Sequence, residues 1–556
     1  MNRWIGLGLF LLLAVLFLRA NHGAARGFFQ GDELDNIGWT PQLPLSAYAA
    51  DLINPIYNGR NFRPVGHLYF RILSRTAGLD FSKYLPPLHL LHLLNVWLLW
   101  LLLRRLGLTA YAASAGVLFF AFHMAVFDLY WKPMYAFDLF CATFCLASLL
   151  AWIGRRRVLA FLAFWMAYKS KELAVMLPAV LAGYEYWLGE RRAKPLIPFF
   201  AVSLSFGLQG IFLNPNSHNA YAFDFTPAAL AESIKYYSGA LFGLPFAGLL
   251  LLPLAAFGRD RRLWLGVAMA VVFFVPLAVL PGRQSSAYWY VPLTGAALAL
   301  GALAQARHGW IVVVGLACWL PWNYAALRDY RDRKLADDAV VRQYIGQLQT
   351  AAPALASMPV FLYRGLPASL PPWGLGGALR FLLPNGNFNI YPFSAPPAMA
   401  LLSNPAAAVL TWDAPSRKLW IAQEATYITM DDLTPVWQLT NGWYALEKGF
   451  RWTAPCATAR LYRAPRADQF EAVLNVGSQA LGAKGYAESS VRLNGAPLGS
   501  IHLTETGIRT VRWPLPPGPP GNVEIEFSTD TPSQSRGDPR ILGTAIVSFG
   551  FLPAGR

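Results

Sequence analysis

Three carboxylates stand close together just beyond the first long apolar segment. Residues 4–20 are almost purely apolar, and Asp32, Glu33 and Asp35 follow in the stretch GDELDN. Ionisable side chains at the end of a membrane segment are costly unless they have a function. Apart from a solvated loop, the roles open to this cluster are a general base, a site for a divalent cation or a partner for a cationic group. Since it contains no His or Cys, its composition does not fit a dedicated zinc site.

Cationic side chains form the second group of residues that could take part in chemistry. Lys169, Lys171 and Glu172 follow one apolar segment, and two ammonium groups there could hold a phosphate, with Glu172 orienting one of them. Arg283 precedes an aromatic stretch that contains Tyr288, and an arginine fork suits bidentate phosphate binding. The alternatives are lysines that extend to water and an anchor in an aromatic belt at the membrane surface.

Two further motifs contain histidine. In residues 62–73, apolar side chains recur at helical spacing while Arg63, His67 and Arg71 are four residues apart. This pattern predicts a helix that lies on the membrane surface. His123, near the end of another apolar segment, is either a substrate contact or, as the simpler interpretation, a packed histidine.

The elements that must position these residues are membrane helices. Of the 556 residues, 55% are hydrophobic, and a spanning helix needs about 20 apolar residues. The sequence predicts a polytopic α-helical membrane protein with about eleven transmembrane helices. The apolar segments are 4–20, 85–103, 110–126, 134–153, 158–169, 173–188, 196–213, 237–257, 263–280, 287–304 and 309–323.

Loop charges predict the orientation. The net charge is +16, and much of it lies in short loops that alternate with loops poor in Lys and Arg. Because such basic loops remain on the cytoplasmic side, the N-terminus is predicted inside and everything after residue 324 outside. This placement explains the positive charge without a nucleic-acid partner. We expect segment 4–20 to be a retained anchor, with a cleaved signal peptide as the alternative.

The sequence predicts three domains. Residues 1–324 form the membrane domain. Residues 325–440 are predicted to form a small exported α/β unit, with a helix at 334–348 and strands at 359–363 and 407–412. Residues 441–556 contain short strands and an Asn494-Gly495 turn, which predicts a β-sandwich.

Taken in order, these motifs resemble the GT-C superfamily of membrane glycosyltransferases that use polyprenyl-phosphate sugars, in their bacterial form. The similarity covers residues 1–324. It lies in the acidic motif, an Arg-Pro start to a membrane-parallel helix, a His-containing turn, a Ser-Lys-Glu motif and an arginine before a Tyr-rich helix. The matching residues are Asp32, Glu33, Arg63, Pro64, His123, Ser170, Lys171, Glu172, Pro178, Arg283, Tyr288, Tyr290 and Pro292.

The resemblance implies an inverting transfer from a polyprenyl-phosphate-linked sugar to a glycan, lipid or protein acceptor at the periplasmic face of a bacterial inner membrane. Asp32 would be the base, with Glu33 second, because the paired Asp-Asp of many relatives is Asp-Glu here. A divalent cation is possible, and no other cofactor is implied. The expected phosphate-binding residues are Lys169, Lys171, Arg283 and Arg63, supported by Asp35, Glu172, His67, His123 and Tyr288.

Two other classes of function compete with this hypothesis. A transporter or flippase of lipid-linked glycans predicts charges deep within the spans and broken helices in paired halves. A non-catalytic, membrane-anchored glycan-binding protein explains the exported domain but gives the acidic and basic clusters no role.

Overall fold

The structure is a computed structural model that describes residues 3–56, 62–212, 222–258, 260–356, 358–395, 407–422, 426–430, 438–464, 466–481, 485–534 and 537–553. Parts of the predicted loops at 21–84 and 214–236 lie outside the described residues. The chain divides into two compact units. The helical unit contains Met1–Arg342 and Ser369–Phe381, and the β-rich unit contains Gln343–Ala368 and Leu382–Arg556.

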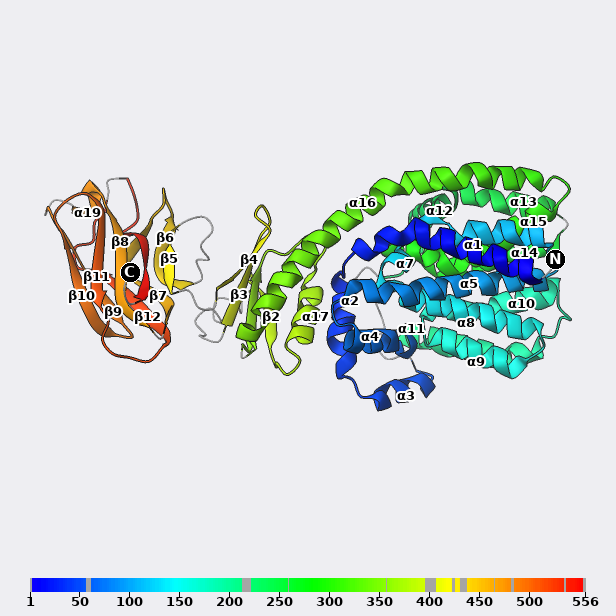
Figure 1. Ribbon diagram of the computed structural model, residues 1–556, viewed down its shortest axis with the longest axis horizontal. Helices are drawn as coiled ribbons and strands as arrows, with labels where there is room; N and C mark the ends of the chain where they lie inside the picture. Colours follow the sequence, from blue (N-terminus) through cyan, green and yellow to red (C-terminus); the bar gives the residue numbers. More distant parts are fainter. Residues whose placement is uncertain are drawn as a thin grey trace. The chain divides into compact units, whose positions relative to one another are not determined.

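Six helices of the described chain contain a stretch long and apolar enough to cross a membrane, and a pair bent by 79° would make a seventh. The six are α1 (Arg3–Asn21), α5 (Leu85–Arg105), α8 (Ala136–Ile153), α14 (Arg261–Ala278), α15 (Tyr290–Gln305) and α16 (Trp310–Leu355) (Figure 1). The bent pair consists of α12 (Pro227–Phe242) and the helical turns that end in α13 (Leu251–Phe257). The protein is therefore a multi-pass membrane protein.

Helical structure occupies each of the eleven predicted segments, but a count of eleven spans is not confirmed. Four helices that belong neither to the six nor to the bent pair have 12, 12, 11 and 16 residues, fewer than the roughly 20 that a span needs. They are α6 (Ala110–Ala121), α9 (Arg157–Tyr168), α10 (Leu177–Trp187) and α11 (Ile197–Phe212).

Four further short helices of the described chain lie between the long ones. They are α2 (Gly31–Trp39), α3 (Leu45–Ile53), α4 (Pro64–Thr76) and α7 (Asp128–Trp131). Two of them, α2 and α4, carry the acidic motif and the amphipathic stretch. The amphipathic stretch at 62–73 does form a helix, α4. Its Leu68 and Ile72 are exposed, whereas His67 and Arg71 are buried in the protein. The exposed apolar side of α4 is suited to contact with lipid.

The helix predicted at 334–348 is not a separate element. It is part of α16, one continuous helix of 46 residues that begins in the last apolar segment and crosses residue 324. No glycine or proline lies between Pro321 and Gly346, so nothing in the sequence interrupts the helix where its composition changes from apolar to charged.

The β-rich unit contains two sheets. The smaller has the order β2-β1-β3-β4, in which β1 pairs in parallel with β2 and β3, and β4 is antiparallel. Its strands are β1 (Val360–Arg364), β2 (Asn389–Pro392), β3 (Ala407–Asp413) and β4 (Lys418–Ala422). Two of them confirm the predicted strands. The connection from β1 to β2 contains α17 (Pro372–Leu382). Within this connection, Ser369–Phe381 belongs to the helical unit.

The larger sheet has nine described strands in the order β10-β9-β12-β7-β13-β8-β11, with β5 beside β13 and β6 beside β7. The predicted β-rich C-terminal region is confirmed. Its described strands form one continuous sheet that curves around the core, whereas a β-sandwich would have two separate sheets. The strands are β5 (Tyr427–Thr429), β6 (Leu439–Leu446), β7 (Arg451–Arg463), β8 (Ala467–Val476), β9 (Ala487–Leu493), β10 (Ala496–Leu503), β11 (Gly507–Pro514), β12 (Gly521–Thr529) and β13 (Ala545–Pro553).

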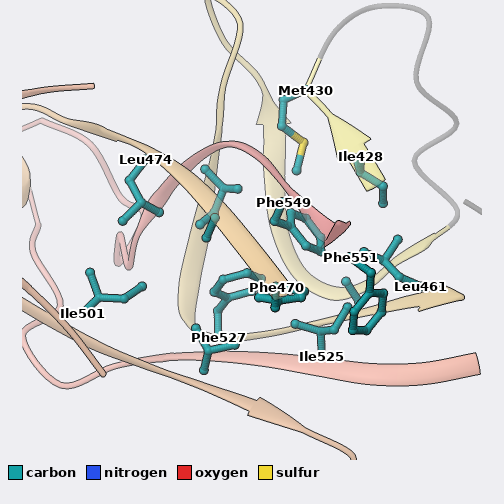
Figure 2. Close-up of a cluster of buried hydrophobic side chains, with 14 of the residues drawn as sticks. Ile428, Met430, Leu461, Phe470, Leu474, Ile501, Ile525, Phe527, Phe549 and Phe551 are labelled. Carbon is teal, nitrogen blue, oxygen red and sulfur yellow. The ribbon is translucent and has the colours of Figure 1, made fainter. Parts of the chain in front are cut away.

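Aromatic and branched side chains fill this sheet. Phe470, Phe527, Phe549 and Phe551 meet inside it and are at most 2% exposed (Figure 2). Asn494 and Gly495, both with positive φ, form the predicted turn between β9 and β10. Alternating burial along the strands thus closes the sheet around an apolar core.

Candidate active site

The acidic motif forms the first turn of α2, where the two adjacent carboxylates differ in environment. Glu33 closes a capping box in which its Oε2 accepts the backbone N–H of Gln30 at 2.6 Å. Its Oε1 accepts the N–H of Met134 at 3.2 Å, and the side chain is 1% exposed. Burial raises the pKa of Glu33 to about 7, although the charge of Lys132 and the two N–H groups oppose the rise. Glu33 therefore acts as a helix cap.

Asp32 points away from this buried position. Its Oδ1 accepts a hydrogen bond from the indole Nε1–H of Trp373 at 2.6 Å. Asp32 and Met134 line both of two adjacent cavities. The large cavity has a volume of about 1080 Å³, and the small cavity has a volume of about 230 Å³. The side chain of Asp32 therefore lies where the two cavities meet.

The large cavity is lined by opposite charges. Asp35 and Arg380 form an ion pair at 3.0 Å on its wall, and Asp51 and Arg63 also line it. Burial raises the pKa of Asp35, while Arg380 lowers it. A cavity with guanidinium groups and carboxylates around one space can bind both a phosphate and sugar hydroxyls.

Arg63 lies at the N-terminal end of α4 and reaches Glu172. Its Nε and Nη2 donate to the two carboxylate oxygens of Glu172, each at 3.0 Å. Burial by itself raises the pKa of Glu172. The positive charges of Arg63 and Lys171 outweigh this effect and hold the pKa of the carboxyl below its usual value. The ion pair connects a motif of the first loop to one more than 100 residues later.

His67 supports this arrangement by packing. Its ring stacks on Phe62 with centroids 5.2 Å apart, and its Nδ1 accepts the backbone N–H of Arg63 at 2.9 Å. Burial, together with the nearby charge of Arg63, holds the pKa of His67 well below the ordinary value. The imidazole is therefore neutral near pH 7 and does not supply a positive charge.

The two predicted lysines occupy different surroundings. Lys171 forms a buried ion pair with Asp138 at 2.5 Å and lies over the ring of Tyr288, with 4.6 Å from Nζ to the centroid. Lys169 contacts aromatic rings at the end of α9. Burial lowers the pKa of Lys169, and the charge of Asp51, a residue of the large cavity, raises it.

Two predicted site residues lie elsewhere. His123 donates a hydrogen bond from Nε2 to the carbonyl oxygen of Leu241 at 2.9 Å and packs between Phe119 and Trp319. This position corresponds to the packed histidine that was the simpler interpretation. Arg283 lies in the turn Pro281–Arg283, near enough to Tyr237 to influence it electrostatically. Neither is among the described residues that line the two cavities, and Lys169, Lys171, Glu172 and Tyr288 are likewise absent from the two linings.

Sequence reasoning missed several charged residues at the site. Lys132 is buried, contacts both carboxylate oxygens of Asp338 at 2.5 Å and donates to the carbonyl of Phe28 at 3.0 Å. Asp338 also accepts the backbone N–H of Phe28 and the side-chain amide of Gln30, so it holds the chain just before α2. Lys132 and Asp138 could have been identified from the sequence, because each is an ionisable residue at the end of, or inside, an apolar segment.

A metal site built from protein ligands alone does not fit these residues. Within the described part of the chain, no group of three or more His, Cys, Asp or Glu side chains is arranged to hold an ion.

Comparisons with known proteins found solved structures of similar fold. No protein-family model matches the chain, and no curated protein matches it in sequence. The structure of ArnT from Cupriavidus metallidurans bound to undecaprenyl phosphate is similar, with 14% identity, a TM-score of 0.47, and coverage of 74% of this chain and 94% of ArnT. The apo structure of the same protein has 16% identity and a TM-score of 0.44, with coverage of 75% and 94%.

The arabinofuranosyltransferase AftD from Mycobacteria is similar with 12% identity and a TM-score of 0.47. The similarity covers 99% of this chain and 58% of AftD. The first of these structures is described as bound to undecaprenyl phosphate, and AftD is described as an arabinofuranosyltransferase. At these values of identity and TM-score, any statement about activity must rest on the residues of the site itself.

Proposed function

We propose that this protein is a membrane glycosyltransferase that moves a sugar from a polyprenyl-phosphate donor to an acceptor hydroxyl. The observation that carries the proposal is the position of Asp32, a carboxylate that lines both a large cavity with arginines in its wall and a small polar cavity. A transferase must place a base beside the incoming hydroxyl, on the face of the sugar opposite the departing phosphate.

The large cavity suits the donor. Arg63 and Arg380 line it, and Lys169 is linked to it electrostatically through Asp51. Lys171 interacts electrostatically with Glu172, the residue that pairs with Arg63. Fixed cations of this kind stabilise the negative charge that develops on a leaving phosphate. The donor proposed here belongs to the class of lipid named in the ArnT structure.

In the proposed reaction, the acceptor hydroxyl loses its proton to the Oδ2 side of Asp32. The acceptor oxygen forms a bond to the anomeric carbon while the bond from that carbon to the phosphate oxygen breaks. The phosphate leaves with the electron pair, and a single displacement of this kind inverts the anomeric centre. Asp32 is preferred over Glu33 because both oxygens of Glu33 already accept backbone N–H groups.

The direct test is transfer of a radiolabelled sugar by the purified protein from a panel of polyprenyl-phosphate sugars. Asp32→Asn should reduce transfer by about 10²–10⁴-fold, the usual contribution of a general base. Asp337→Asn is the matched control, because Asp337 is an exposed carboxylate of α16, and it should retain wild-type transfer. Full transfer by Asp32→Asn would exclude Asp32 as the base. A wild-type protein that translocates the lipid without transferring sugar would favour a flippase.

We propose a bacterial inner-membrane location with the N-terminus in the cytoplasm and the β-rich unit in the periplasm, on the basis of the loop charges. Cys456 of the β-rich unit supplies the test in a Cys318→Ser background, since Cys456 and Cys318 are both exposed while Cys141 and Cys145 are buried. A membrane-impermeant maleimide should label intact spheroplasts, and Cys456→Ser should abolish the labelling. Labelling that requires lysed cells would reverse the orientation.

A further inference from the structure

Helix α17 contacts α2 backbone to backbone. A Cβ atom added to Gly38 would overlap the carbonyl group of Gly377, and one added to Gly377 would overlap the backbone of Leu34 and Asp35. Glycine at these positions allows two helices to approach more closely than side chains permit. The segment between β1 and β2 is therefore packed directly on the helix that carries the acidic motif.

The side chains of α17 bind the other two carboxylates of that motif, Asp32 and Asp35. The indole of Trp373 donates to Asp32 at 2.6 Å, and Arg380 forms the ion pair with Asp35 at 3.0 Å. Hydrogen bonds to ionised carboxylates are strong and directional. α17 thus sets the direction in which Asp32 presents its second oxygen.

Trp373 remains largely accessible despite this hydrogen bond. Its side chain is 56% exposed and forms part of the wall of the small cavity. Gln30, Asp128, Tyr135 and Lys334 line the same cavity. An exposed aromatic ring beside amide, carboxylate, phenol and ammonium groups matches a sugar, whose apolar face stacks on a ring while its hydroxyls form hydrogen bonds.

We propose that the small cavity binds the acceptor, that the acceptor is a carbohydrate, and that Trp373 both stacks on its ring and positions Asp32. This inference rests on the proposed function, because the donor then occupies the large cavity on the other side of Asp32. The hydroxyl of a sugar lying on Trp373 would be next to the carboxylate that takes its proton. Trp373 is a positioning residue for Asp32 and a direct contact of the acceptor.

The first experiment does not depend on catalysis. Oxidation of individual tryptophans in the purified full chain is measured by peptide mass spectrometry, with and without a panel of mannosyl, arabinosyl, rhamnosyl and glucosyl disaccharides. At least one disaccharide should slow the oxidation of Trp373 by about tenfold when it occupies about nine sites in ten. Trp310 is the matched control because it is 61% exposed on α16, and its oxidation should not change. Protection by none of the sugars would overturn the inference.

The second experiment separates the two roles of Trp373. Trp373→Phe retains a ring but loses the N–H donor, and should lower kcat about tenfold with little change in the KM for the acceptor. Trp373→Ala should also raise the acceptor KM about tenfold and leave the donor KM unchanged. A wild-type acceptor KM in Trp373→Ala would contradict stacking. If Trp373 is protected but the wild type transfers no sugar, the proposed function fails while the sugar site stands.

Discussion

The two units of this protein differ in their buried ion pairs: among the described pairs, those in which both side chains are at most 9% exposed lie in the helical unit, which also has exposed pairs such as Lys83–Asp80. In the helical unit, the side chains of Lys132 and Asp338 are 8% and 2% exposed, and those of Lys171 and Asp138 are 9% and 3% exposed. In the β-rich unit, the Arg509–Glu505 pair is 40% and 75% exposed. Buried pairs carry a desolvation cost that often exceeds their attraction, whereas exposed pairs contribute little in either direction.

The difference shows which charges position the site. Both buried pairs of the helical unit stand beside the proposed active site: one fixes the chain before α2, and the other lies beside the Arg63–Glu172 pair. The β-rich unit is stabilised by an apolar core instead (Figure 2). The comparison predicts large effects for substitutions at the buried pairs and small ones at the exposed pairs.

Asp338→Ala should have the largest effect on stability. It leaves the ammonium of Lys132 buried without its carboxylate, which costs about 3–5 kcal/mol. The measurement is the thermal unfolding midpoint of the purified protein, with the exposed neighbour substitution Asp337→Ala as control. The double variant Lys132→Met/Asp338→Leu should recover much of the loss, because it removes both charges. An unchanged midpoint in Asp338→Ala would contradict the structural role of the pair.

Glu33→Gln should weaken the pH dependence of stability. The folded pKa of about 7 lies above the ordinary value of 4.5, so the folded state binds the extra proton in this window. The contribution of Glu33 to stability is therefore present at low pH and is lost as the pH rises towards 7, by an amount on the order of 3 kcal/mol. Unfolding midpoints at about pH 5 and about pH 7.5 measure it. Equal pH dependence in both proteins would refute the raised pKa.

Arg63→Lys should have a moderate effect on donor binding. Lysine keeps the charge but loses the planar fork that binds Glu172, and we expect the donor KM to rise about tenfold, or about 1.4 kcal/mol. Arg75→Lys is the matched control on the same helix, since Arg75 contacts only a backbone carbonyl among the described hydrogen bonds. A donor KM that rises equally in both variants would remove Arg63 from the donor site.

Glu505→Gln should have the smallest effect. Its partner Arg509 is also exposed, so breaking the pair should change the free energy of unfolding by less than about 0.5 kcal/mol. Chemical denaturation of the full chain in detergent, followed by tryptophan fluorescence, provides the measurement. A loss as large as that in Asp338→Ala would remove the distinction between the two units.

Local patterns sufficed for much of the fold and for part of the site. Apolar runs located the helices, the Asn494-Gly495 turn located a hairpin, and a charged cluster beside a membrane helix singled out Asp32. The helices and the hairpin are confirmed because periodicity and turn geometry act over a few neighbouring residues, whereas the role of Asp32 stays a prediction. The separate helix at 334–348 was not found, since the change to charged residues is not accompanied by a helix breaker.

By itself, the sequence determined that the chain crosses a membrane several times, that its C-terminal region is β-rich and that acidic and basic groups gather near helix ends. Only the tertiary structure decided that Glu33 is a cap while its neighbour Asp32 faces two cavities, and that Trp373 and Arg380 complete the site. The reason is distance along the chain: Trp373 meets Asp32 across 341 residues, and no local pattern encodes which surfaces will pack together.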